Sequence, residues 1–141
     1  MAGLVAIAVV LVAATAYGLW HRSTDGRMRG NDLAAEARPV LGPAELGEAL
    51  GERATLVQFS SAFCQPCRAA KVILASVAAS AEGVHHIEID AESHLDLVRE
   101  VGIMRTPTTL ILDAEGRITA RATGVPRKDQ VLAAIGRTLP A

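Results

Sequence analysis

Residues 2–20 form the longest apolar stretch of the chain; they carry no charged side chain and are rich in Val, Leu, Ala and Ile. As a helix this stretch would measure about 28 Å, which is close to the thickness of the hydrocarbon layer of a bilayer. Tyr17 and Trp20 lie at its end, where amphipathic rings favour the boundary between membrane and water. The pattern predicts a transmembrane anchor over residues 1–21, in contact with lipid along residues 2–20.

A cleavable signal peptide is the alternative reading of this segment. Ala14-Thr15-Ala16 has the small-x-small pattern of a cleavage site that follows an apolar stretch. A signal peptide normally carries Lys or Arg before its apolar stretch, and none precedes this one. Cleavage is therefore the less favoured of the two interpretations.

Beyond the apolar segment the pattern changes twice. Residues 22–38 are mostly polar or turn-forming and predict a linker, part of which could be helical near residues 33–37. Residues 39–141 alternate between helical and strand patterns and predict a folded domain. The predicted strands are residues 54–60, 84–90, 108–113 and 117–123, and the predicted helices are residues 43–50, 64–80, 93–101 and a last one that opens at Pro126. Alternating units imply a parallel half, and the last two strands form a hairpin around Gly116. We therefore expect an α/β domain with a mixed sheet flanked by helices.

Side chains on one face of each predicted helix are expected in the core of this domain. They are Leu46, Leu50, Val72, Ile73, Val77, Leu95, Leu97, Val98, Val101, Val131, Leu132 and Ile135. Aromatic residues make up only 3% of the chain, so aliphatic side chains must supply this core. The formal net charge of −1 gives no reason to expect nucleic-acid binding.

Cys64 and Cys67 are the only cysteines of the chain, and they stand between a predicted buried strand and a predicted helix. One helical turn separates them, which brings two sulfur atoms close enough to bond. The first thiol lies near unpaired helix N–H groups and the positive end of the helix dipole, and both favour a thiolate. The pattern predicts a redox pair in which Cys64 is the nucleophile.

Metal binding is the competing interpretation of a Cys-x-x-Cys motif. Zinc would need two further ligands, and the four histidines show no ligand-like spacing. These are His21, His85, His86 and His94. Haem attachment requires a histidine after the second cysteine, where Arg68 stands. We expect no metal and no cofactor; a binding module that holds Cu(I) or a partner protein through the two thiols is the alternative function.

Residues 39–139 resemble the thioredoxin family. Two motifs carry the resemblance: Val-Gln-Phe-Ser-Ser-Ala-Phe-Cys-Gln-Pro-Cys-Arg over residues 57–68, and Val-Gly-Ile-Met-Arg-Thr-Pro-Thr over residues 101–108. The Leu-Ile-Leu-Asp run over residues 110–113 and Gly116 follow at the spacing of the family. The resemblance implies a thioredoxin-like fold.

The resemblance also implies a substrate-binding surface. Pro107 is expected to follow a cis peptide bond and to pack beside the cysteine pair. The main chain of Thr106 would then pair with an extended segment of the substrate. Phe63, Gln65 and Pro66, which surround the first cysteine, complete the expected set.

Four positions depart from the thioredoxin pattern. Thioredoxins carry a buried Asp where this chain has Gln58, and an amide cannot relay a proton from the second thiol as a carboxylate can. Phe63 replaces Trp, Gln65 replaces Gly, and Thr106 replaces a bulky aliphatic side chain. The resemblance therefore implies the fold without fixing the direction of electron flow.

Together these observations predict a membrane-anchored thiol–disulfide oxidoreductase, a protein-disulfide reductase that acts on disulfide-containing proteins. Cys64 attacks the substrate disulfide and Cys67 resolves the mixed disulfide. The reducing partner would be a thioredoxin reductase inside the cell or a membrane thiol transporter outside it. The arginines that follow residues 2–20 slightly favour the cytoplasmic side of the cell membrane, whereas a tethered redox domain more often lies outside.

Overall fold

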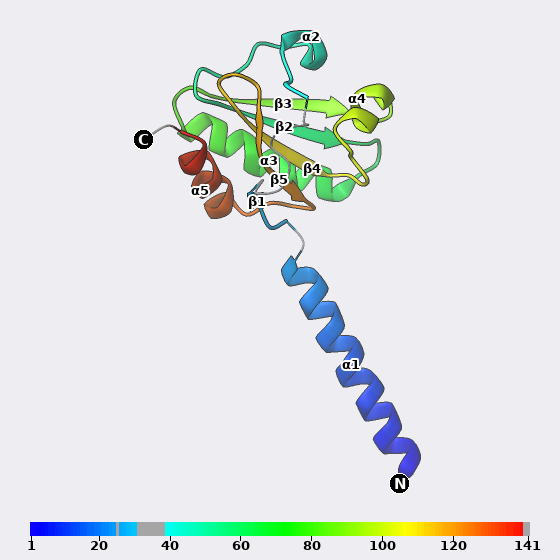
Figure 1. Cartoon of the computed structure of the whole chain (residues 1–141). Helices are drawn as coiled ribbons and strands as arrows, with labels where there is room; N and C mark the ends of the chain where they lie inside the picture. The colour runs from blue at the N-terminus through cyan, green and yellow to red at the C-terminus, as the bar shows by residue number, and fades with distance from the viewer. Residues whose placement is uncertain (25, 31–38, 140–141) are drawn as a thin grey trace.

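The computed structural model describes residues 1–24, 26–30 and 39–139. A long helix, α1 (Ala2–Thr24), extends away from a domain in which helices flank a sheet (Figure 1). The strands are β1 (Arg29–Gly30), β2 (Ala54–Ser60), β3 (Val84–Asp90), β4 (Thr108–Asp113) and β5 (Ile118–Thr123). The remaining helices are α2 (Pro43–Leu46), α3 (Gln65–Ser80), α4 (Leu95–Glu100) and α5 (Lys128–Thr138).

The five strands lie in the order β1-β5-β4-β2-β3. β2 and β3 are parallel, as the α3 crossover between them requires, and the other pairs are antiparallel. All seven residues of β2 are buried. The sheet is therefore mixed, as expected, and the strand that leads to the cysteine pair lies inside it.

Two apolar clusters fill the two faces of the sheet. Phe59 and Val57 of β2 belong to the cluster that includes Leu97 of α4. Leu56, which points to the opposite face, packs with Leu74 of α3 and with α5. Phe59, Leu56 and Leu74 are fully buried, and each contributes about 1.5–3 kcal/mol relative to exposure. The cluster under α3 fixes the helix that carries the cysteines.

The helix faces differ from the sequence expectation at three positions. Val72 of α3 is 71% exposed, Leu132 of α5 is 40% exposed and Leu95 of α4 is 53% exposed. Small residues explain two of these differences, because Ala70 and Ala134 are buried against the sheet and rotate the packed faces of α3 and α5. The other expected core side chains are buried or half-buried; they are Leu46, Leu50, Ile73, Val77, Leu97, Val98, Val101, Val131 and Ile135.

Three strands match their predicted bounds, and the other boundaries differ by a few residues. The last strand begins at Ile118 rather than at residue 117. Helix α2 ends at Leu46 because Gly47 adopts a left-handed conformation with φ 75° and donates its N–H to the carbonyl of Pro43. Helix α5 begins at Lys128, two residues after the proline that was expected to open it.

Helix α1 has no buried residue, and its length and composition are sufficient to cross a membrane. A signal sequence near an N-terminus has the same two properties. The Thr15 hydroxyl within the apolar stretch is satisfied locally, because it donates to the carbonyl oxygen of Leu11 at 2.7 Å. Tyr17 and Trp20 lie together near the end of the helix, with ring centroids 6.2 Å apart.

Part of the predicted linker joins the sheet. Arg29 and Gly30 form the edge strand β1 and pair with Arg121 and Ala120 of β5, a strand that sequence reasoning did not include. The main-chain N–H of Gly26 donates to the carbonyl of Thr123 at 2.6 Å. The connection between α1 and the domain is therefore bound to β5. The predicted helical stretch near residues 33–37 lies outside the described residues.

Candidate active site

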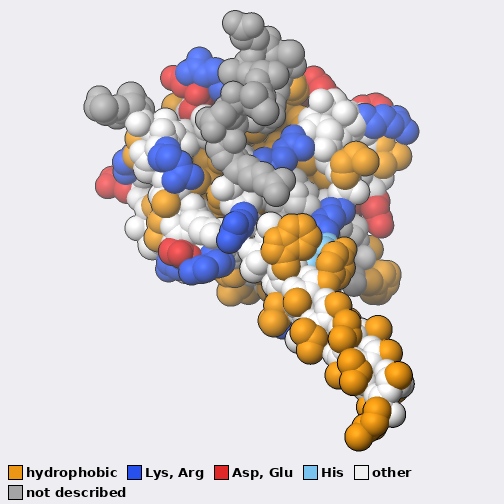
Figure 2. Space-filling model, turned by 60° about the horizontal axis from the view of Figure 1, so that its bottom comes forward, with side chains coloured by type: hydrophobic (Ala, Val, Ile, Leu, Met, Phe, Trp, Pro, Cys, Tyr) orange, Lys and Arg blue, Asp and Glu red, His pale blue; other side chains and the backbone are white. Residues whose placement is uncertain are grey.

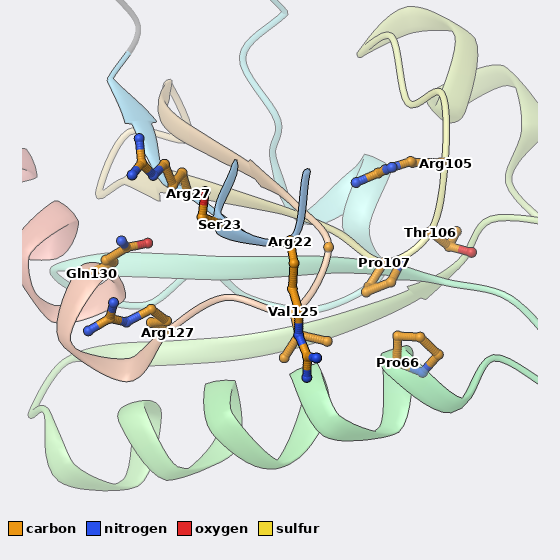
Figure 3. Close-up of a pocket in the computed structure, with 11 residues that line it drawn as sticks. Arg22, Ser23, Arg27, Pro66, Arg105, Thr106, Pro107, Val125, Arg127 and Gln130 are labelled. Carbon is orange, nitrogen blue, oxygen red and sulfur yellow. The ribbon is translucent and has the colours of Figure 1, made fainter. Parts of the chain in front are cut away.

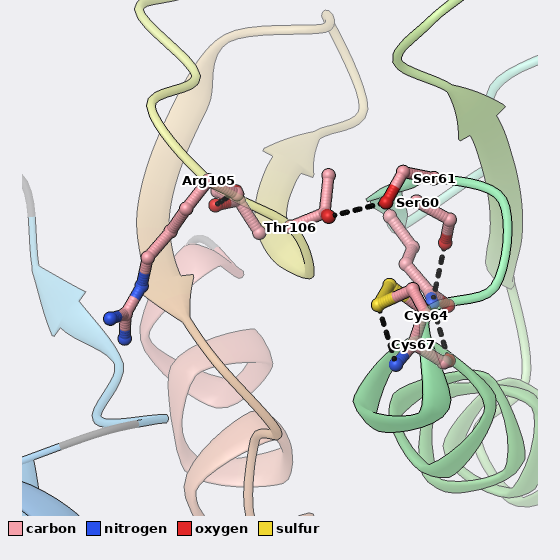
Figure 4. Close-up of a disulfide and its surroundings, with 8 residues drawn as sticks. Ser60, Ser61, Cys64, Cys67, Arg105 and Thr106 are labelled. Atoms are coloured by element: carbon pink, nitrogen blue, oxygen red, sulfur yellow. Dashed lines mark hydrogen bonds between the residues drawn. A yellow bond between two sulfur atoms is a disulfide. The ribbon is translucent and has the colours of Figure 1, made fainter.

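The cysteine pair lies where β2 gives way to α3. Cys64 is the N-cap of α3, and Pro66 in the first turn occupies a position where a missing N–H costs nothing. The two cysteines form a disulfide with an S–S distance of 2.03 Å and a Cα–Cα distance of 5.2 Å. The N–H of Cys67 points at the sulfur of Cys64, with the nitrogen 3.2 Å from it (Figure 4). The positive end of the α3 dipole is therefore directed at the sulfur of Cys64.

The two sulfurs differ in accessibility. Cys64 is half-buried, whereas Cys67 is 3% exposed. Around the outer cysteine the chain is open, since Gln65 and Pro66 are exposed. Phe63 is fully exposed and adopts a left-handed conformation with φ 57°, which is unusual for a bulky residue. A reaction partner can therefore reach the first cysteine before the second.

The loop before β4 lies against this site. The Thr106–Pro107 peptide bond is cis, as the resemblance implied. The hydroxyl oxygens of Thr106 and Ser61 are 2.8 Å apart, and this hydrogen bond joins the proline loop to the loop that follows β2 (Figure 4). Pro66, Thr106 and Pro107 line one cleft. Two of the expected substrate-binding residues, Phe63 and Gln65, lie outside that lining.

Gln58 lies beneath the inner cysteine. Its side chain is fully buried, and its Nε2 donates to the carbonyl oxygen of Cys67 at 2.8 Å and to the Ser60 hydroxyl at 2.9 Å. Its Oε1 lies 3.1 Å from Nε2 of His86, so that ring nitrogen must carry a proton. Every polar atom of the Gln58 side chain is thus used, which is what a buried amide requires.

His85 and His86 are neighbours near the start of β3, but their surroundings differ. His85 is exposed, but His86 is half-buried on the face that α3 covers. Burial lowers the pKa of His86 below its usual value, with Lys71 adding to the shift and the charge of Glu88 opposing it. The alternation of side chains along a strand could have predicted the burial of His86. Because Ile87 faces one apolar cluster, His86 must face the other side of the sheet.

A charged pair extends this polar network. Lys71 of α3 lies 2.5 Å from a carboxylate oxygen of Glu88 on β3. Desolvation raises the pKa of Glu88, but hydrogen bonds from Lys71 and Ser60 outweigh it, so the pKa is lowered overall. Within the described residues, no group of three or more His, Cys, Asp or Glu side chains is placed to hold a metal ion. The Cys64–Cys67 disulfide itself supports thiol–disulfide redox chemistry.

Comparison with known proteins matches this chain to thioredoxins. The thioredoxin family model matches residues 42–137. Human thioredoxin domain-containing protein 2 is 36% identical over 75 residues, and the mouse protein of that name is 38% identical over 58 residues. These stretches cover 53% and 41% of this chain but only 13% and 11% of those longer proteins.

Solved structures agree with the family match. Chloroplastic thioredoxin z is 26% identical with a TM-score of 0.55; the match covers 62% of this chain and 79% of that one. A thioredoxin from Nicotiana alata is 25% identical with a TM-score of 0.56, over 63% of this chain and 76% of that one. The matched region contains the cysteine pair and the cis-proline loop, and the chain belongs to the thioredoxin family.

Proposed function

We propose that this chain is a membrane-anchored protein-disulfide reductase whose redox pair is Cys64 and Cys67. One observation carries the proposal: the outer cysteine caps a helix and is only partly buried, whereas the inner cysteine is buried one turn further along. This difference divides the work between an attacking and a resolving thiol. Membership of the thioredoxin family supports thiol–disulfide exchange as the chemistry.

The proposed reaction moves two electrons from the protein to the substrate. The Cys64 thiolate attacks one sulfur of a substrate disulfide, the substrate S–S bond breaks, and the released thiolate takes up a proton. The Cys67 thiolate then attacks the Cys64 sulfur of the mixed disulfide. The second substrate thiol leaves, and the Cys64–Cys67 disulfide remains. A dithiol donor must reduce that disulfide before the next cycle, and no cofactor takes part.

The cis-proline loop is the proposed docking surface for the substrate. Thr106 and Pro107 lie beside the cysteine loop, and the main chain of Thr106 would pair with an extended segment. Phe63 offers an exposed aromatic ring next to the attacked sulfur. Gln65 and Pro66 complete the rim. Substrate specificity in this proposal comes from main-chain pairing together with the neighbouring surface.

Helix α1 is the proposed membrane anchor. In this division residues 1–21 span the membrane, residues 22–38 connect, and residues 39–141 carry the redox site. The arginines that follow the apolar residues 2–20, of which Arg22 and Arg27 are exposed, favour the cytoplasmic side. A thioredoxin reductase would then be the electron donor. On the opposite side a membrane thiol transporter would take that role.

A turnover assay tests this function. The full chain in detergent micelles should accelerate the reduction of a disulfide-containing protein by dithiothreitol. Cys64→Ser should abolish the acceleration, and Arg137→Ser, an exposed change far along the chain, should not. If wild-type protein gives no acceleration but retains Cu(I) tightly at equal concentration, the binding-module alternative replaces the proposal.

A further inference from the structure

A cleft of about 740 Å³ opens beside the cysteine pair, and its charge is one-sided. Four arginines line it, Arg22, Arg27, Arg105 and Arg127, together with the cis-proline loop (Figure 3). None of the described residues that line it is Asp or Glu. We propose that this arginine cleft binds an acidic segment of the substrate, next to the substrate cysteine that Cys64 attacks. The inference rests on the proposed disulfide reductase function.

The arginines come from separate parts of the chain and are brought together by the docked connection. Arg22 belongs to the last turns of α1, Arg105 precedes the cis peptide, and Arg127 is the residue directly before α5. Gly26 holds the end of α1, which carries Arg22, near the other two arginines. It has φ 74°, and a Cβ atom there would lie 2.0 Å from the carbonyl oxygen of Val125. Only glycine permits this close contact, which holds the end of α1 beside the active site.

Two of the four arginines, Arg22 and Arg27, offer charge that no described side chain neutralises. Arg22 and Arg27 are exposed, and neither side chain makes a hydrogen bond or an ion pair within the described part of the chain. Arg127, by contrast, pairs with Asp129 at 3.0 Å. A second hollow of about 460 Å³ shares Arg27 and Arg105 and adds Arg121, and Figure 2 shows Lys and Arg side chains around the point where α1 meets the domain. Guanidinium groups bind carboxylates through paired hydrogen bonds.

The position of the cleft identifies the occupant. Pro66, Thr106 and Pro107 form one end of it, and these residues surround the cysteine pair. A peptide held in a mixed disulfide with Cys64 must lie against that end, so its neighbouring residues extend toward the arginines. A lipid headgroup would explain Arg22 and Arg27 at the end of a membrane helix, but it would not explain the continuity with the proline loop. The observations therefore favour an acidic peptide.

Matched peptides test the inference. Three disulfide peptides of one scaffold carry a triplet of Glu, Gln or Lys beside the reacting cysteine, and the full chain in neutral detergent micelles reduces each of them. We expect kcat/KM for the Glu peptide to exceed that for the Gln peptide by about three- to tenfold, because exposed charge pairs are individually weak. The preference should lie mainly in KM and should shrink as salt is added.

Variants assign the preference to the cleft. The double change Arg22→Gln and Arg27→Gln should bring the Glu-to-Gln ratio of kcat/KM close to one. Arg137→Gln, an exposed arginine outside the lining, should leave the ratio as in wild type. A ratio that survives the double change overturns the inference.

The remaining outcomes separate the possible failures. Reduction of all three peptides at equal rates overturns the acidic preference and leaves the reductase function in place. Reduction of none of them overturns the reductase function itself. Reconstitution in phosphatidylcholine and in phosphatidylserine nanodiscs tests whether a lipid headgroup, rather than a peptide, occupies the cleft. The inference expects the Glu preference in both, and its loss in phosphatidylserine alone would mean that the headgroup occupies the cleft.

Discussion

Gln58 donates a hydrogen bond from its buried side-chain amide to the main-chain carbonyl oxygen of Cys67, with the nitrogen 2.8 Å from the oxygen. The contact places an uncharged donor where the family resemblance implies a buried acid. In the proposed reaction Cys67 loses a proton when it resolves the mixed disulfide, and a donor cannot accept that proton. Gln58 therefore positions the first turn of α3, and proton removal from Cys67 must follow another route.

Gln58→Asp should restore a base beneath Cys67. We expect a pH-dependent acceleration of mixed-disulfide release, measured by pre-steady-state reduction of a disulfide substrate across pH. Gln58→Asn is the matched control, because it has the same shorter side chain but remains an uncharged donor. Both variants should lose stability, by about 1–3 kcal/mol when a buried partner is left unsatisfied. Equal pH profiles for Asp, Asn and wild type would contradict the account.

His86 should make the stability of the domain depend on pH. Its pKa is lowered by burial in the folded state, so below its usual value near 6.5 the unfolded chain binds a proton that the folded chain does not. The free energy of unfolding should therefore fall as pH drops from 7 to about 5. His86→Gln, which can still donate to Gln58, should flatten that part of the curve.

Chemical denaturation of the full chain in detergent measures this effect, with His85→Gln as the exposed neighbouring control. Glu88 and Asp90 also have lowered pKa values, but their folded forms lose stability only as pH falls through the usual carboxyl range and below it. The two windows are thus separate. If His86→Gln does not change the slope of the free energy of unfolding between pH 7 and 5, His86 is not the group that causes this pH dependence.

The sequence was sufficient for strands β2 to β5 and for the cysteine pair, whereas the short edge strand β1 was not predicted. Strands such as residues 54–60 have continuous or alternating apolar patterns, which can be recognised without knowing the tertiary structure. A Cys-x-x-Cys motif at the start of a helix has few interpretations other than a redox pair. Helix faces were harder. Val72 and Leu132 are exposed because buried alanines, Ala70 and Ala134, allow close packing that hydrophobicity alone does not reveal.

The surroundings of the cysteine pair could not be predicted, because they depend on contacts between segments that are distant in the sequence. His86 reaches Gln58 only because β2 and β3 are parallel, with Leu56 opposite His86 and Gln58 opposite Glu88. The docking of Gly26 on β5 likewise depends on one close contact with Val125. A polar stretch such as residues 22–38 gives no periodic signal of such a contact, so it was predicted as a linker.

The membrane side of the redox site can be measured directly. If the domain is cytoplasmic, a membrane-impermeant maleimide should not label Cys64 in intact, mildly reduced cells but should label it after permeabilisation. Cys67→Ser provides a single reactive thiol for the assay, and Cys64→Ser gives the background. Labelling in intact cells would place the domain on the outer side of the membrane. The electron donor would then be a membrane thiol transporter rather than a thioredoxin reductase.

Trapping of the mixed disulfide tests the central claim most directly, since it assigns a role to each sulfur. Cys67→Ser should accumulate substrate bound to Cys64, visible as a shifted band on non-reducing gels that dithiothreitol removes, because nothing remains to resolve the intermediate. Cys64→Ser should accumulate none, because Cys67 is only 3% exposed. Peptide mapping should place the bond at Cys64. Equal trapping by both variants, or trapping by Cys64→Ser alone, would contradict the account.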